Sequence, residues 1–329
     1  MTNPHVEIAD HERLPTAPRV SIVVMTYNHE PYLREAVESL ARQVTSFEYE
    51  ILIGEDASHD RTRDVALGLQ AEFPHLVRLF LSERNRGMTG NFRFLIDLCR
   101  GEYFAGCEGD DFWIDDHKLE RQVHALDRVR TVDMAFTRGY RLYGDGTRVA
   151  GWNYGDQPRV VSSREMFRGL GYIAPAASSM MRGELVRSLP DWIDDAPVGD
   201  VFHYLAATAR GGAWYEPNLT VCYRMAQPTS FSVAHENRTD EELIAFFKSA
   251  IDYVERTCRH YRVPRRVMAE RLNEYQLQIA WRRFNQRKML SGLWELARVD
   301  ADFLARGAGR RLSRLIGLGG RAEPDHGRG

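Results

Sequence analysis

Short apolar runs alternate with amphipathic segments in the first third of the chain. Residues 20–25 (VSIVVM) are nearly all apolar and mostly β-branched, which is typical of a strand buried on both faces of a parallel sheet. Residues 33–40 carry apolar side chains at i, i+3, i+4 and i+7, which predicts an amphipathic helix. The unit recurs, with further strands expected at 49–53, 77–81 and 103–107. This alternation predicts an α/β fold with a mostly parallel central sheet.

The regular alternation stops near residue 150. Before that point we expect a helix at 119–126, a strand at 134–136 and a hairpin turn at 143–146. Beyond it, the pattern predicts a helix at 201–209 and two short strands at 213–215 and 219–223. From about residue 238 the chain has the pattern of consecutive amphipathic helices.

Polar residues follow each of the expected parallel strands. The carboxyl ends of such strands meet at one edge of the sheet, where ligands bind. The sequence therefore places three groups on one rim, namely Thr26, Tyr27 and Asn28, then Asp56, and the acidic turn Glu108, Gly109, Asp110 and Asp111.

Composition excludes several other classes of protein. The chain has 329 residues, 43% of them hydrophobic, and a net charge of -2, so we expect an ordinary folded protein with no nucleic-acid partner. Its four cysteines form no C-x-x-C pair, which argues against a disulfide scaffold or a zinc site. The polar N-terminus has no apolar signal segment and no later stretch approaches a membrane span, so a cytoplasmic location is expected.

Two common nucleotide-binding signatures are missing. No G-x-G-x-x-G follows the first strand and no G-x-x-x-x-G-K-[ST] occurs, which argues against a dinucleotide dehydrogenase and a Walker-type nucleotidase. A phosphate ligand would then need another source of positive charge, such as Mg²⁺ or Mn²⁺ held by the carboxylates of Glu108, Asp110 and Asp111. The alternative is an acidic turn that caps the next helix. None of the eleven histidines has metal-binding spacing, so all are expected to be solvated or structural.

Several blocks, taken in order, resemble the inverting family 2 glycosyltransferases of the GT-A fold. They are VSIVVMTYNHEPYLREAVESL, GEDASHDRT, NRGMTGN, GEYFAGCEGDDFW and KLERQ. The resemblance implies a flexible leader at 1–18, a GT-A domain at 19–235 and a helical C-terminal extension at 236–329. Within the GT-A domain, it implies a nucleotide-binding half at 19–115 and an acceptor half at 116–235.

The resemblance also implies roles for the rim residues. Thr26, Tyr27 and Asn28 would line the nucleotide site, and Asp56 would accept the N3–H of uracil or thymine. Glu108, Gly109 and Asp110 occupy the D-x-D position, with Asp110 as chief ligand of Mn²⁺ or Mg²⁺. Glu108 replaces the usual Asp there and would contact the ribose or the metal.

Asp111 and the aromatic residues Phe112 and Trp113 would then face the donor sugar and the acceptor. For Trp113, core packing is an equally simple interpretation. Transfer with inversion also needs a general base, and Asp200 best matches the family's position after a turn and at the start of a helix. Its alternative role is a helix N-cap, and Asp195 is the second candidate base.

A late Tyr223-Arg224 pair resembles another family block. Arg224 would pair with the donor phosphates, although a structural ion pair is the alternative. The histidine that commonly follows in the family is replaced by Ala226. Gln227, Thr229 and Ser230 are the polar residues beside it.

The expected function is therefore metal-assisted transfer of a sugar from a nucleotide diphosphate sugar, UDP-linked by this interpretation, to a saccharide or lipid-linked acceptor. The alternatives are a non-catalytic relative that binds nucleotide sugars and a sugar-nucleotide nucleotidyltransferase. The C-terminal tail carries an apolar stripe from Leu304 to Ile316 beside Arg306, Arg310 and Arg314. This pattern leaves peripheral membrane contact, self-association and packing on its own domain open.

Overall fold

The fold is built on one mixed sheet. The computed structural model describes residues 5–168, 173–225, 235 and 237–305. Within these residues the strands follow the order β1-β4-β3-β2-β5-β10-β7-β11-β6, with β8 beside β7 and β9 beside β11. Their bounds are β1 His5–Ile8, β2 Val20–Thr26, β3 Tyr49–Glu55, β4 Val77–Ser82, β5 Tyr103–Glu108, β6 Phe112–Trp113, β7 Met134–Leu142, β8 Arg148–Gly151, β9 Arg159–Val161, β10 Met180–Arg182 and β11 Ala213–Arg224.

The four strands expected from the apolar runs form the parallel centre of this sheet. β2 pairs in parallel with β3 on one side and with β5 on the other, and β3 pairs in parallel with β4. Each strand extends one or two residues beyond the apolar run and into the polar residues that follow it. The predicted α/β architecture is confirmed.

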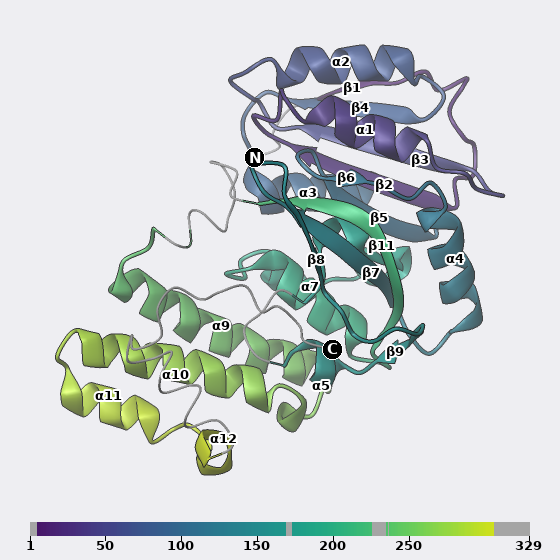
Figure 1. The fold of residues 1–329 in the computed structure, drawn as a ribbon. Helices are drawn as coiled ribbons and strands as arrows, with labels where there is room; N and C mark the ends of the chain where they lie inside the picture. Colours follow the sequence, from purple (N-terminus) through teal and green to yellow (C-terminus); the bar gives the residue numbers. More distant parts are fainter. Residues whose placement is uncertain (1–4, 169–172, 226–234, 236, 306–329) are drawn as a thin grey trace.

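Helices cover both faces of the sheet (Figure 1). Alternate residues of β2 point to opposite sides, since Ile22 and Val24 pack with α1, α2 and α4, whereas Val23 packs with α3 and the later helices. Burial on both faces explains why the strands have continuous apolar runs. The helices are α1 Leu33–Ala41, α2 Thr62–Glu72, α3 Gly87–Leu98, α4 Lys118–Arg128, α5 Ser163–Met166, α6 Gly183–Arg187, α7 Gly199–Thr208, α9 Asp240–His260, α10 Ala269–Asn285, α11 Met289–Leu296 and α12 Ala301–Ala305.

The second half of the sheet differs from the prediction in one element. The expected strands at 213–215 and 219–223 are parts of the single strand β11, which pairs in parallel with β7 along its length. Register shifts between Glu216 and Val221 interrupt the pairing, which is why the pattern suggested two strands. The predicted turn at 143–146 is confirmed as the connection between antiparallel β7 and β8.

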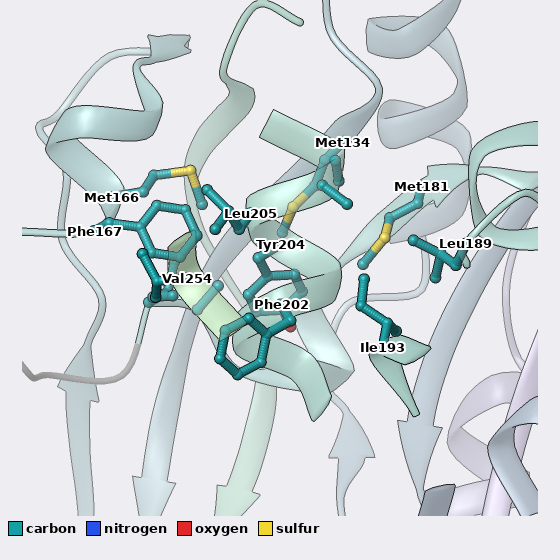
Figure 2. Close-up of a cluster of buried hydrophobic side chains, with 14 of the residues drawn as sticks. Met134, Met166, Phe167, Met181, Leu189, Ile193, Phe202, Tyr204, Leu205 and Val254 are labelled. Carbon is teal, nitrogen blue, oxygen red and sulfur yellow. The ribbon is translucent and has the colours of Figure 1, made fainter. Parts of the chain in front are cut away.

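The C-terminal helices share the main core. Val254 of α9 lies among Phe202, Tyr204 and Leu205 of α7 (Figure 2). Residues of α10, including Leu272 and Tyr275, belong to the same cluster. The expected helical extension is therefore present, and α9 and α10 complete the hydrophobic core that begins in the sheet.

The predicted flexible leader at 1–18 is wrong for part of its length. Residues His5–Ile8 form β1, which pairs antiparallel with the edge strand β4. Val6 and Glu7 alternate apolar and polar, but this strand is too short and too polar to stand out in the sequence. The His5 ring packs edge-on against Phe94 at a centroid distance of 4.6 Å.

Among the described residues, no helix is long and apolar enough to cross a membrane. Ala226, Gln227, Thr229, Ser230 and all residues after Ala305, among them Arg306, Arg310 and Arg314, lie outside the described residues.

Candidate active site

The strand register brings the three predicted polar groups onto one rim. Met25 lies opposite Glu108, and Thr26 lies opposite Glu55. The backbone N–H of Asp56 donates to the Thr26 carbonyl at 3.1 Å. The N–H of Gly109 donates to the Met25 carbonyl at 2.9 Å. Residues far apart in the sequence therefore lie side by side at the carboxyl ends of β2, β3 and β5.

Asp56 is held rigidly at this rim. It is 2% exposed, and its Oδ1 accepts a hydrogen bond from the backbone N–H of Arg86 at 2.8 Å. Burial raises the pKa of the Asp56 carboxyl, although the Arg86 and Gly87 amides oppose this effect. A fixed acceptor of this kind suits recognition of one N–H group on a ligand.

The loop after β2 is fixed by the loop after β3. Asn28 has a φ of 57°, its N–H donates to Ser58 Oγ at 3.0 Å, and its Oδ1 accepts from the His59 N–H at 2.9 Å. The Tyr27 ring meets the His59 ring edge-on at 6.0 Å. Ser58 was not singled out from the sequence, although it lies in the same block as Asp56.

Gly109 makes the closest approach between the acidic turn and the loop after β2. A Cβ at this position would lie 2.7 Å from His29 Nδ1 and 2.8 Å from Thr26 Oγ1. Among the described residues, neither of these two buried atoms has a hydrogen-bond partner. His29, expected to be solvated or structural, thus lies at the rim. Burial lowers the pKa of its imidazole, and the charge of Asp110 opposes that shift.

The acidic turn brings the carboxyl groups of Glu108, Asp110 and Asp111 together where their side chains are largely buried. Burial, followed by the charges of Asp110 and Asp200, raises the pKa of Glu108 to about 8. Burial also raises the pKa of Asp111, whose Oδ2 is buried without a partner among the described residues. Like charges this close destabilise one another unless a cation or a proton compensates.

These donors fit a hard divalent cation. Glu108 and Asp110 offer carboxylate oxygens, the ligand type that Mg²⁺ and Mn²⁺ prefer, and their mutual repulsion is what a cation would relieve. Among the described side chains, no three His, Cys, Asp or Glu residues are grouped to enclose an ion. In proteins Mg²⁺ commonly takes only one or two carboxylates and completes its coordination with phosphates and water.

Asp200, which comes from α7 on a distant part of the chain, acts electrostatically on Glu108 of this acidic turn. It lies in the first turn of α7, and its Oδ1 accepts from the Val201 N–H at 2.7 Å. Its pKa is raised by burial, while the positive charge of Arg271 on α10 acts in the opposite direction. Tyr204, one helical turn later, is buried, and the charge of Asp200 adds to the effect of burial in raising its pKa. Neither Tyr204 nor Arg271 was identified from the sequence.

Asp195, the second candidate base, lies in a different environment. It is exposed, on the connection between the short helix Asp191–Ile193 and α7. Its neighbour Asp194 pairs with Arg93 of α3 at 2.7 Å. The structure therefore brings Asp200, and not Asp195, into the electrostatic environment of Glu108.

Arg224 stabilises the acidic turn through hydrogen bonds from its backbone and its side chain. Its backbone N–H donates to Asp111 Oδ1 at 2.9 Å, and its guanidinium donates to the Asp110 carbonyl and to the Glu35 carboxylate. The guanidinium also lies over the rings of Tyr32 and Phe112. These contacts show the ion pair that was the structural alternative for Arg224, and its contact with the donor phosphates stays a prediction.

Phe112 and Trp113 also differ from the expectation that they face a sugar. Both are buried, and Trp113 is 0% exposed. The chain turns inward after Asp111 to form β6, which pairs antiparallel with β11, and Lys118 Nζ lies 3.9 Å from the centre of the Trp113 ring. The two rings therefore fill the core beneath the acidic turn.

Comparison with solved structures supports the GT-A fold. Staphylococcus aureus TarS, in a structure with UDP-GlcNAc, aligns with a TM-score of 0.61 and 16% identity over 90% of this chain and 83% of that chain. The mannosyltransferase PcManGT from Pyrobaculum calidifontis, in complex with GDP-Man and Mn²⁺, gives a TM-score of 0.58 and 15% identity over 90% and 81%. These similarities concern the fold.

Sequence comparison identifies more closely related proteins. An uncharacterized protein of Mycobacterium tuberculosis is 41% identical over 129 residues, which are 39% of this chain and 37% of the relative. An uncharacterized glycosyltransferase of Nostoc is 32% identical over 143 residues, 39% of this chain and 44% of the relative. The matched part of the chain thus spans less than half the length of these relatives. The family described as Glycosyl transferase family 2 matches residues 21–188, about half of the chain, and the chain therefore belongs to that family.

Proposed function

We propose that this protein transfers a sugar from a nucleotide diphosphate sugar to a hydroxyl group of an acceptor, with inversion at the anomeric carbon. The observation that carries the proposal is the placement of Asp200 at the start of α7, where its charge acts on the Glu108 carboxyl of the acidic turn. The family membership and the GT-A fold support the same class of reaction.

The donor nucleotide would lie along the rim formed by Thr26, Tyr27, Asn28 and Asp56. Asp56 is a fixed carboxylate that can accept the N3–H of uracil, a contact that cytosine does not offer. TarS was solved with UDP-GlcNAc and PcManGT with GDP-Man, so these neighbours support a nucleotide diphosphate sugar as the donor, and the choice of uridine rests on Asp56. Glu108 and Gly109 would complete the nucleotide site, Glu108 through its charge and Gly109 by leaving room for Thr26 and His29.

A divalent ion, Mn²⁺ or Mg²⁺, would be held by Asp110 with Glu108 beside it, and its charge would stabilise the departing diphosphate. The PcManGT structure with Mn²⁺ supports this choice of cofactor. The Arg224 backbone N–H donates to Asp111 Oδ1, and the Arg224 guanidinium donates to the Asp110 carbonyl. These two contacts would hold the backbone of Asp110 in place.

Asp200 would act as the general base and remove the proton from the acceptor hydroxyl as it attacks. Its position at the start of α7, partly exposed beside the acidic turn, leaves it accessible to an acceptor. We propose a saccharide or a lipid-linked acceptor, as in the assembly of bacterial surface polysaccharides.

The test is the variant Asp200→Asn, with Asp195→Asn as the matched control. We expect Asp200→Asn to lose metal-dependent turnover of the donor by about 10²–10⁴-fold and to keep its affinity for the nucleotide. Asp195→Asn should retain turnover. The measurement is release of the nucleoside diphosphate from radiolabelled donor, together with calorimetric binding of the nucleotide.

Loss of turnover in Asp195→Asn but not in Asp200→Asn would contradict the assignment. Binding of nucleotide sugars without turnover, across several acceptors, would favour the non-catalytic alternative. A nucleotidyltransferase is disfavoured because residues 26–30 (TYNHE) are neither Gly-rich nor basic.

A further inference from the structure

Helix α11 exposes a continuous apolar surface, which we call the α11 face: Met289, Leu290, Leu293 and Trp294. Leu290 is 84% exposed and Trp294 is 59% exposed. The four residues follow at i, i+1, i+4 and i+5, so they lie on one side of the helix. Other large exposed hydrophobic residues in the described part of the chain are scattered over separate elements.

The opposite side of α11 explains why this face points outward. Gly292 packs so closely on α10 that a Cβ there would lie 2.5 Å from the Phe284 ring. Glu295 is 4% exposed and accepts hydrogen bonds from the Gln276 amide of α10. These contacts fix the helix with Gly292 and Glu295 inward, and they leave four of its large apolar residues outward, unlike an ordinary surface helix. Figure 1 shows α11 at the outer edge of the C-terminal helices.

Cations flank the two ends of the α11 face. Arg287 and Lys288 are exposed at one end and Arg298 at the other. Glu295, the only carboxylate between them in the sequence, is buried and lies 3.7 Å from the Arg298 guanidinium. Lys288 shares Glu241 with Arg283, so this ion-pair group keeps an excess of positive charge. The Arg298 guanidinium lies 4.8 Å from the centre of the Trp294 ring and extends the basic rim over the apolar surface.

We propose that the α11 face binds an anionic lipid surface. Leucine and tryptophan side chains enter the region between lipid headgroups and acyl chains, and flanking arginine and lysine side chains pair with anionic headgroups. A second copy of the chain fits this face less well. A two-fold interface would place the same cations opposite one another, and like charges repel.

The experiment uses the full chain and two kinds of vesicle. One is phosphatidylcholine alone, and the other is phosphatidylcholine mixed with phosphatidylglycerol. We expect the protein to float with the mixed vesicles in low salt, to be released by high salt, and to bind neutral vesicles far more weakly.

Leu290→Glu and Trp294→Glu should each weaken binding to the mixed vesicles by about tenfold or more, because each removes apolar surface and adds a negative charge. Arg287→Glu should weaken binding and reduce its dependence on salt. The matched controls are Val44→Glu, which alters an apolar side chain that is 55% exposed, and Arg128→Glu on the exposed surface of α4. Both controls should bind as the unmodified protein does.

Three results would overturn the proposal. The first is no flotation with the mixed vesicles. The second is equal flotation of the α11 variants, which would locate lipid binding elsewhere. The third is a wild-type dimer in solution that Leu290→Glu separates, with no vesicle binding, which would assign the face to a second copy. Because all the altered positions are exposed, unchanged melting temperatures should confirm that the variants fold.

Discussion

At the scale of single residues, Gly109 determines how closely the acidic turn approaches the loop after β2. We predict that Gly109→Ala lowers affinity for UDP by at least tenfold, because the added methyl group would displace His29 and Thr26 from the rim. The measurement is titration calorimetry with Mn²⁺ present. Gly144→Ala is the matched control, since a Cβ there meets nothing within 4 Å, and it should leave affinity unchanged. Equal affinities in the two variants would contradict this prediction.

A second residue-scale prediction concerns Lys118, which is fully buried. Burial lowers the pKa of its ammonium from 10.5 to about 7, although its Nζ donates to Gln122 at 2.8 Å. The charges of Cys107, Asp115 and Glu216 oppose this shift, and that of Arg121 adds to it. Between pH 7 and 10.5 the unfolded chain binds the proton that the folded chain has released. Lys118 therefore makes the free energy of unfolding rise with pH in this window and adds no slope below it.

We predict that Lys118→Met removes this part of the pH dependence, at most about 1.4 kcal/mol per pH unit. The variant should gain most relative to the unmodified protein at and below pH 7, and the difference should shrink toward pH 10.5. Urea unfolding at a series of pH values measures the effect. Lys248→Met, at a half-exposed lysine of α9, is the control. Parallel curves for the unmodified protein and Lys118→Met would show that burial does not lower this pKa.

At the scale of elements, α9 joins the helical extension to the domain that carries the site. Val254 is fully buried among α7 residues (Figure 2). We predict that Val254→Ala lowers the free energy of unfolding by about 2 kcal/mol and shifts one cooperative transition of the whole chain. Asp252→Ala, at an exposed position of the same helix, should have little effect. Differential scanning calorimetry measures the effect of both substitutions. The shared core would be contradicted if the C-terminal helices unfolded in a separate transition and if Val254→Ala shifted only that transition.

Much of the element order could be predicted from the sequence because burial on both faces leaves a strong signal. The runs at β2, β3, β4 and β5 are almost entirely apolar, and the polar residues after them lie on one rim as expected. Local patterns could not show that Trp113 points inward, since β6 is held by pairing with the distant strand β11. The same limit applies to Arg271 and Tyr204, whose proximity to Asp200 depends on how α7 and α10 pack.

At the scale of the whole molecule, the proposed site depends on residues from the first third of the chain, from α7 and from the C-terminal helices. The rim and acidic turn come from the first third, Asp200 comes from α7, and Arg271 of α10 acts on Asp200 from the C-terminal helices. The family match ends at residue 188, but the fold of TarS aligns over 90% of the chain. The structural similarity therefore extends beyond the part that the family match covers. We therefore infer that the C-terminal helices are part of the structure that holds the proposed base.

The central claim is that a divalent ion at Asp110 joins this rim to a uridine diphosphate. Titration calorimetry of UDP and CDP, with and without Mn²⁺, tests it most directly. We predict that UDP binds when Mn²⁺ is present and at least tenfold more weakly without it or in Asp110→Asn, and that CDP binds more weakly than UDP. Asp195→Asn should behave as the unmodified protein. Binding of UDP that is independent of both Mn²⁺ and Asp110, or no binding of UDP under any of these conditions, would contradict the account.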